Sequence, residues 1–256
     1  MKVFRKQRQQ MAADNNVIKY LRYAIGEILL VVIGILIALQ VNNWNENRKE
    51  QKQEIQIYTE LESELLQNKK EILNTITKQK KRIKSTQSLI YDIVKKEPYS
   101  STIYNRFVTA SDEFQIIPET SAYEGLKNIG LQILSNDSLR IRITNLYQLD
   151  FKHFDESGDK NSEYSIEGLL FPYQDKYLFA DYNQTAKYAF KYSDSITVQR
   201  LKIKDYDKFL ADNELLKVLQ LTLYDRSNKI DFETETVIKI EETIKRIKKE
   251  LDKLNK

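Results

Sequence analysis

The sequence predicts a mainly α-helical protein. We expect an N-terminal transmembrane helix, then an extracytoplasmic helical domain built on two long antiparallel helices with a smaller helical insert. Three observations support this. The 256 residues include only six glycines and three prolines, roughly a quarter to a half of average usage, which leaves few turn-forming residues. Residues 28–39 carry no polar side chain. On both sides of the middle, apolar residues recur at spacings of three and four, as in amphipathic helices.

The composition excludes several classes of site. Without cysteine, the chain has no disulfide framework, thiolate zinc site, iron–sulfur cluster or cysteine nucleophile. Its single histidine, His153, excludes a multi-histidine metal site and is the only candidate for imidazole catalysis. The G-x-x-x-x-G-K, G-x-S-x-G and H-E-x-x-H motifs are missing from the sequence. We therefore expect no enzyme activity, no cofactor and no metal.

The apolar run predicts a membrane span. Extended to residues 23–41 it has about the 20 residues that a bilayer requires. A buried core helix and a cleaved signal peptide are the alternatives. The sequence Ala38-Leu39-Gln40 does not fit a small-x-small cleavage site, and the polar flanks are sharp for a core helix. Arg22, Tyr23 and Trp44 would lie at the membrane interfaces.

Positive charge predicts the orientation. Residues 1–22 contain six lysines and arginines, whereas the opposite flank contains three, so residues 1–22 form a basic cytoplasmic tail under the positive-inside rule. Residues 1–27 also account for the whole formal net charge of +4. The remaining chain has no net basic excess, and we expect no nucleic-acid partner.

Three residues of the span fall on one helical face. Gly34 and Ala38 form a small-x-x-x-small pattern, which lets two transmembrane helices approach closely. Glu27 has three interpretations: a side chain that reaches the headgroups, a polar contact to a partner helix, or a proton-relay carboxylate.

The N-terminal segment resembles a known family. The motif begins with Phe4-Arg5-Lys6, continues as YLRYAIGE over residues 20–27 and ends as LLVVIGILIALQVNNWNENRKE over residues 29–50. It is similar to the signature of an uncharacterised family of single-span membrane proteins from Flavobacteria and related Bacteroidota. SAYEGLKNIG over residues 121–130 and LSNDSLR over residues 134–140 resemble the periplasmic part of that family. The resemblance implies a bacterial inner-membrane anchor with a periplasmic helical domain, and no catalytic residues.

Two long helices are predicted on either side of the middle segment. Residues 42–97 form the membrane-proximal helix, in which the asparagines around Trp44 could host a bend, and residues 207–256 form a coiled-coil-like C-terminal helix. The predicted seam of the C-terminal helix, interrupted by charged residues at Arg226 and Glu233, consists of Leu216, Leu219, Leu223, Ile230, Val237, Ile240, Ile244, Ile247, Leu251 and Leu254. The seam can pack on the first long helix of the same chain or between protomers, and the pattern does not decide which.

The insert, residues 98–206, is predicted to be compact, mostly helical and rich in aromatic residues. Ser121 and Glu124 fit a capping box, and Gly130 can end that helix. Asn136 or Asp137 can cap a second helix over about 138–154, with Leu149 and Tyr147 beside its apolar face. Residues 195–203 read as one strand, paired with 187–192.

Tyrosines are frequent in the second half of the insert. The candidates for a partner surface are Tyr173, Tyr177, Tyr182 and Tyr188. The alternative is that these rings pack the insert across the ends of the long helices.

These features together predict a membrane-anchored periplasmic interaction or scaffold protein. Its partners would be the lipid bilayer and either a second copy or another envelope protein. The alternatives are a periplasmic sensor that signals through a partner, and a stator-like coupling subunit that uses Glu27.

Overall fold

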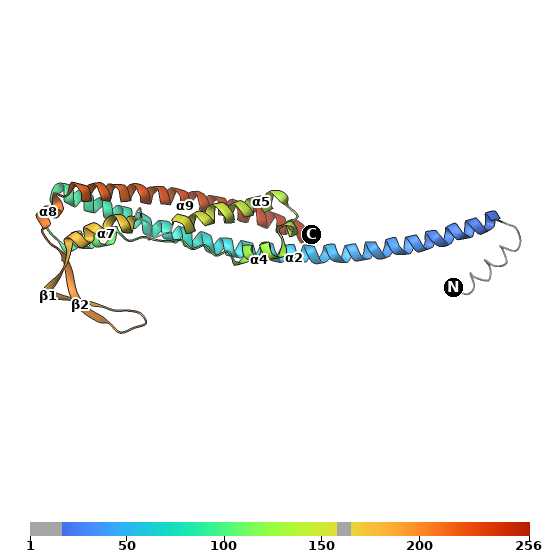
Figure 1. Cartoon of the computed structure of the whole chain (residues 1–256), viewed down its shortest axis with the longest axis horizontal. Helices are drawn as coiled ribbons and strands as arrows, with labels where there is room; N and C mark the ends of the chain where they lie inside the picture. Colours follow the sequence, from blue (N-terminus) through green and yellow to red (C-terminus); the bar gives the residue numbers. More distant parts are fainter. Residues whose placement is uncertain (1–16, 158–164) are drawn as a thin grey trace. The chain divides into compact units, whose positions relative to one another are not determined.

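The computed structural model describes residues 17–157 and 165–256 and is mainly α-helical, as the sequence predicts (Figure 1). The chain divides into two compact units, Met1–Gln56 and Ile57–Lys256. Most of the predicted basic tail, residues 1–16, lies outside the described residues.

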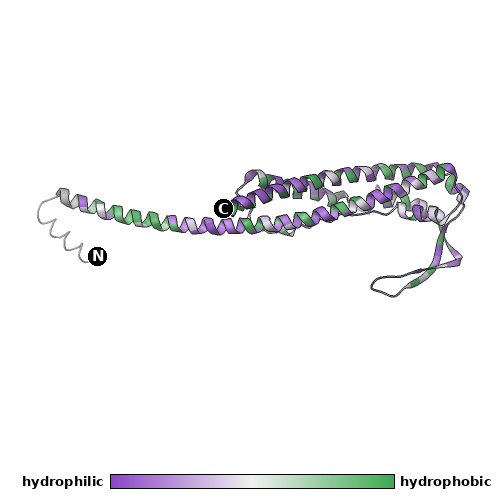
Figure 2. Cartoon of the chain, turned by 180° about the vertical axis from the view of Figure 1, so that it is seen from behind, coloured by the Kyte–Doolittle hydropathy of each residue, from purple (hydrophilic) through white to green (hydrophobic). Residues whose placement is uncertain are grey.

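The first unit is built on α2 (Val17–Lys95), which continues into the second unit as one helix. The helix is continuous through the asparagines around Trp44. Every large apolar side chain of residues 28–39 is exposed, and Figure 2 shows this part of α2 as a continuous hydrophobic stretch. The helix is therefore long and apolar enough to cross a membrane, and its apolar part is not buried by the described chain.

The second unit is organised by the α2 segment from Ile57 onward and by α9 (Asn213–Leu254). The two helices are antiparallel, because Lys69 of α2 pairs with Glu241 at 2.6 Å and Glu62 with Lys248 at 3.4 Å. Their apolar residues share one core. In this chain the C-terminal seam thus packs in cis.

Local chemistry sets the ends of both long helices. At the end of α2, Lys96 adopts a left-handed conformation (φ 53°), and the backbone amides of Lys96 and Glu97 bond the carbonyls of Ile93 and Asp92. This is a Schellman motif, and Pro98 follows it because proline cannot continue a helix. Asp212 caps α9 by accepting from the Leu215 amide at 3.0 Å.

The insert contains mostly short elements. They are α3 (Ser101–Ala110), α4 (Ser121–Ile129), the 3₁₀ turn η1 (Leu131–Ile133), α5 (Asp137–Asn145), the π-helical turn η2 (Leu146–Phe151), α6 (Lys152–Ser157), α7 (Ile166–Tyr177), β1 (Leu178–Tyr188), β2 (Ile196–Ile203) and α8 (Tyr206–Leu210).

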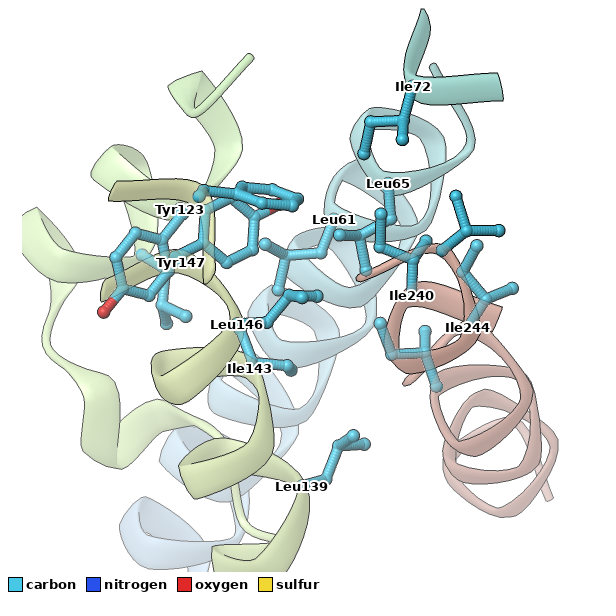
Figure 3. Close-up of a cluster of buried hydrophobic side chains, with 14 of the residues drawn as sticks. Leu61, Leu65, Ile72, Tyr123, Leu139, Ile143, Leu146, Tyr147, Ile240 and Ile244 are labelled. Carbon is cyan, nitrogen blue, oxygen red and sulfur yellow. The ribbon is translucent and has the colours of Figure 1, made fainter. Parts of the chain in front are cut away.

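Two hydrophobic cores hold this unit together. The first joins α2, α4, α5, η2 and α9, and Figure 3 shows Leu61 and Leu65 of α2 facing Ile143 and Leu146 on one side and Ile240 on the other. The second joins the end of α2 to α3, α7, α8 and the start of α9 around the fully buried Phe107 and Phe209, whose rings meet edge to face at 5.0 Å. The insert packs along the helix pair and contributes to both cores.

The N-terminus of α4 is capped differently from the prediction. Ser121 is the first helical residue, and its hydroxyl donates to Glu64 of α2 instead of capping α4. The same carboxylate accepts from the Ala122 amide at 2.7 Å and from the Tyr147 hydroxyl at 2.6 Å. The capping box is wrong because Thr120, not Ser121, is the N-cap residue, and the Glu124 amide bonds the Thr120 carbonyl at 2.8 Å.

The other insert helices agree more closely with expectation. Gly130 ends α4 with φ 112°, a conformation that favours glycine, and Asn136 caps α5 through the Leu139 amide. The helix over 138–154 exists, but its π-helical turn η2 shifts the side-chain register. Tyr147 is consequently buried, whereas Leu149 is exposed.

Strands β1 and β2 form an antiparallel hairpin, the only sheet among the described residues. The strand predicted over 195–203 is present as β2. Its predicted partner, residues 187–192, is mostly wrong: β2 pairs with residues 178–188, from Leu178 opposite Ile203 to Tyr188 opposite Ile196, and residues 189–195 connect the strands.

Candidate functional site

The predicted seam of α9 faces the interior. Leu219, Ile230, Val237, Ile240, Ile244 and Ile247 are buried, and Leu216, Leu223, Leu251 and Leu254 are half-buried. The two charged positions that interrupt the repeat are buried as well: Arg226 is 1% exposed and Glu233 is 4% exposed. Two of the buried charges of this unit therefore lie where the apolar repeat of α9 fails.

The Glu233 side chain of α9 faces α2 and has few polar partners there. One carboxylate oxygen accepts a hydrogen bond from the Gln79 side-chain amide at 2.6 Å. Burial raises the pKa of Glu233 to about 7, although the Gln79 bond and nearby Lys229 act in the opposite direction. The carboxyl group is thus close to its titration point at neutral pH.

Lys229 lies one helical turn before Glu233 and forms two ion pairs. Its ammonium contacts Glu113 at 2.7 Å, on the segment after α3, and Asp225 of α9 at 3.2 Å. Burial opposes its charge, but these two carboxylates raise the pKa of Lys229 above its ordinary value. Lys229 therefore carries its charge at neutral pH.

Arg226 fixes the turn that follows α3. Its guanidinium donates to the backbone carbonyl of Ala110 at 2.9 Å and to that of Asp112. Burial lowers the pKa of Arg226 to about 10, partly offset by the carboxylate of Glu113. It remains a cation and satisfies carbonyls that would otherwise lie unpaired in the interior.

Glu233 and Lys229 border a cavity of about 230 Å³. The lining comprises Glu113, Phe114, Gln115, Ile116, His153, Phe154, Asp225, Asn228, Lys229, Phe232 and Glu233. His153, the only candidate for imidazole chemistry, lies at this cavity with its ring 4.3 Å from that of Phe232. Among residues 17–157 and 165–256, no group of three or more histidine or acidic side chains could hold a metal ion. No sequence pattern indicated this cavity, because its walls come from segments far apart in the chain.

A second candidate surface is the β1–β2 hairpin. Tyr182 is 84% exposed and Tyr192, in the connection, is 89% exposed; Tyr188 and Phe190 are each half exposed. Apolar residues of β2 are exposed beside them, including Ile196. Aromatic rings of the insert thus gather on an open hairpin.

The tyrosines predicted as a partner surface separate into two groups. Tyr182 and Tyr188 belong to the hairpin and are exposed, whereas Tyr173 is half-buried in α7. Tyr177 is 3% exposed, and its hydroxyl donates to Asp212 at 2.6 Å, so the prediction is wrong for this residue. Although burial opposes it, hydrogen bonds from Lys176 and Tyr177 lower the pKa of Asp212 to about 2.

The residues predicted for the membrane lie on α2 of the first unit. Glu27, Gly34 and Ala38 are exposed, and a Cβ added at Gly34 would meet no described atom within 4 Å apart from its chain neighbours and the nearby backbone of its own helix. The predicted interface residues Arg22, Tyr23 and Trp44 are exposed too. Their exposure is compatible with contacts to lipid or to a partner helix.

The described features define a mainly α-helical protein with one helix long enough to cross a membrane, a helical unit with two cores and an exposed aromatic hairpin. The chain belongs to a family of unknown function (DUF6090), whose model matches residues 27–164, more than half of its length. The matched region extends from the apolar part of α2 through α6, so the hairpin and α9 lie beyond it. No curated protein and no solved structure matches the chain.

Proposed function

We propose that this chain is a membrane-anchored periplasmic interaction or scaffold protein that works without catalysis. In this proposal, residues 23–41 cross the inner membrane of a flavobacterium or a related bacterium, and residues 1–22 lie in the cytoplasm. The exposed apolar part of α2 and the excess of lysine and arginine before it support the anchor and its orientation.

The β1–β2 hairpin is the observation that carries the interaction role. Isolated two-stranded hairpins are marginally stable in water, and neither outer edge of this one has a partner strand among the described residues. It nevertheless presents Tyr182, Tyr188, Tyr192 and Phe190 to solvent. Contiguous exposed apolar surface marks interaction sites, and tyrosine is enriched at protein interfaces.

The hairpin suits recognition by strand addition. A strand of the partner would pair with a free edge, while the tyrosines would enter pockets on the partner and provide most of the affinity. The bulge between Asp181 and Thr185 disturbs the ladder of β1, which makes β2 the more regular edge.

Photo-crosslinking in native membranes tests this proposal. A crosslinking amino acid replaces Tyr182 or Tyr192 on the hairpin. The control replaces Tyr224, which is also exposed (70%) but lies on α9. We expect adducts from the two hairpin positions, identified by mass spectrometry, and none from the control. A self-adduct would indicate a homo-oligomeric scaffold, and a second envelope protein would be the partner itself. No adduct at either hairpin position, or equal adducts at Tyr224, would contradict the proposal.

A further inference from the structure

We infer that the cavity beside Glu233 is a binding site for a small organic ammonium compound, an aliphatic primary amine or diamine. This site is independent of the hairpin and of the interaction role proposed above. The walls of the cavity, its unsatisfied acceptors and its charges each support the assignment.

The cavity has the size and walls for such a ligand. Its volume of about 230 Å³ equals that of roughly eight liquid water molecules, below the range of drug-sized pockets. Three phenylalanines line it: Phe114 from the segment after α3, Phe154 from α6 and Phe232 from α9. The apolar rings accommodate a short alkyl chain, and aromatic faces attract ammonium groups.

The polar atoms that lack partners at this site are acceptors. One oxygen of Glu233 is held by Gln79, while the other, Oε2, is buried without a hydrogen-bond donor in the described chain. Glu113 shows the same pattern. Its Oε1 accepts a hydrogen bond from the Lys229 ammonium, and its Oε2 is buried without a hydrogen-bond donor. A buried carboxylate oxygen without a donor costs free energy. The ligand that relieves both costs must bring N–H or O–H donors.

The charges favour a cation over a neutral donor. Glu113, Asp225 and Glu233 line the cavity together with one lysine, Lys229, whose ammonium is already engaged by Glu113 and Asp225. Glu233 has no ion pair within this set. A ligand ammonium would supply its missing counter-charge, and a charge-assisted hydrogen bond is about twice as strong as a neutral one.

A metal ion is a poorer fit. The described acidic and histidine side chains include no convergent group of three that could coordinate one. An extended diamine, in contrast, can reach separate carboxylates, one at each end, with its methylene groups against the phenylalanines.

The test measures thermal stability of the full chain in detergent at pH 8, with 1,4-diaminobutane as the probe and 1,4-butanediol as its neutral counterpart. We expect the diamine to raise the Tm by several degrees with saturation, because a ligand that binds only the folded state stabilises it, and the diol to have no effect. In Glu233→Gln the apparent affinity should fall at least tenfold. Glu235→Gln, a substitution at an exposed glutamate of the same helix, should keep it.

Three results would overturn the inference: no saturable shift up to about 10 mM diamine, an equal shift with the diol, or unchanged affinity in Glu233→Gln. Circular dichroism establishes that each variant folds. If Glu233→Gln does not fold, Glu113→Gln takes its place, and retention of full affinity there would contradict the inference. Because the hairpin plays no part in this assay, its outcome is separate from that of the crosslinking experiment.

Discussion

Two buried charges, Arg226 and Glu233, occupy positions of α9 where its repeat would place leucine or isoleucine. They differ in how well they are compensated. Arg226 donates to two backbone carbonyls and so ties the segment after α3 to α9. Glu233 has one neutral donor, Gln79, and one unsatisfied oxygen. Burial without a counter-ion is expensive, which explains why the pKa of Glu233 rises to about 7 whereas Arg226 stays charged.

Glu233→Gln tests this difference through pH dependence. The pKa of Glu233 in the folded chain, about 7, exceeds its ordinary value of 4.5, so the folded state binds more protons in between. The stability that protonated Glu233 provides is therefore complete below pH 4.5 and is lost as the pH rises through 7. The amide that Glu233→Gln introduces cannot ionise. Without ligand we therefore expect the variant to be more stable than the parent at pH 8 by about 2–3 kcal/mol and nearly equal at pH 4.5.

Thermal or urea unfolding of the full chain in detergent at the two pH values measures this effect. Glu235→Gln serves as the control, since its exposed side chain should show no pH-dependent difference from the parent. A Glu233→Gln chain that is less stable than the parent at pH 8 would contradict the prediction. It would show that interactions in the folded chain offset the cost of burying the ionised carboxylate.

At the scale of elements, the short helices depend on contacts from distant segments. Glu64 of α2 bonds the start of α4 through Ser121 and Ala122, and η2 through Tyr147. Tyr147 in turn stacks on Tyr123 of α4, with ring centroids 4.4 Å apart. Burial and the bond to Glu64 raise the pKa of Tyr147 above its ordinary range, so its hydroxyl stays a donor. One carboxylate thus fastens two elements of the insert to the long helix.

Glu64→Ala should therefore destabilise the second unit strongly. The substitution leaves the buried Tyr147 hydroxyl and the Ala122 amide without an acceptor, and we expect a loss of about 3 kcal/mol in the free energy of unfolding. Glu71→Ala, at an exposed position of α2, should stay within about 0.5 kcal/mol of the parent. Urea unfolding followed by circular dichroism measures both. Equal stabilities of the two variants would mean that α4 and η2 do not rely on Glu64.

The sequence predicted the elements unevenly. The long helices follow from the periodicity of their own residues: the predicted bounds at 97 and 207 lie two and six residues from the observed ends at Lys95 and Asn213. The start of α4 and the register of η2 depend on Glu64 and on packing against α2, which no local pattern records. The first strand of the hairpin was predicted at residues 187–192, later in the chain than β1, because the pairing of two strands depends on contacts between distant residues.

At the scale of the whole molecule, the second unit is an antiparallel helix pair with an insert that shares both of its cores. The first unit contributes the apolar part of α2. Under the proposed topology, the two chain termini lie on opposite sides of the inner membrane.

Reporter fusions in a bacterial host measure that topology. Alkaline phosphatase, which is active only in the periplasm, should be active when fused after Lys256, whereas green fluorescent protein should be dark there and bright at the N-terminus. The proposed orientation rests on the excess of positive charge in residues 1–22, so replacing their lysines and arginines should weaken the preference for this orientation. The opposite pattern of activity and fluorescence at both termini would contradict the orientation and the periplasmic role together.

The sequence alone determined the fold class, the apolar segment and the two long helices, because glycine and proline content, hydrophobic length and helical periodicity are local properties. It also indicated that the insert is rich in aromatic residues. Only the tertiary structure decided that the α9 seam packs in cis, that Tyr177 is buried while Tyr182 is exposed, and that Glu113, Lys229 and Glu233 border one cavity. The reason is physical: burial and charge pairing depend on which distant segments meet, and in a helix pair one shift of register changes every partner.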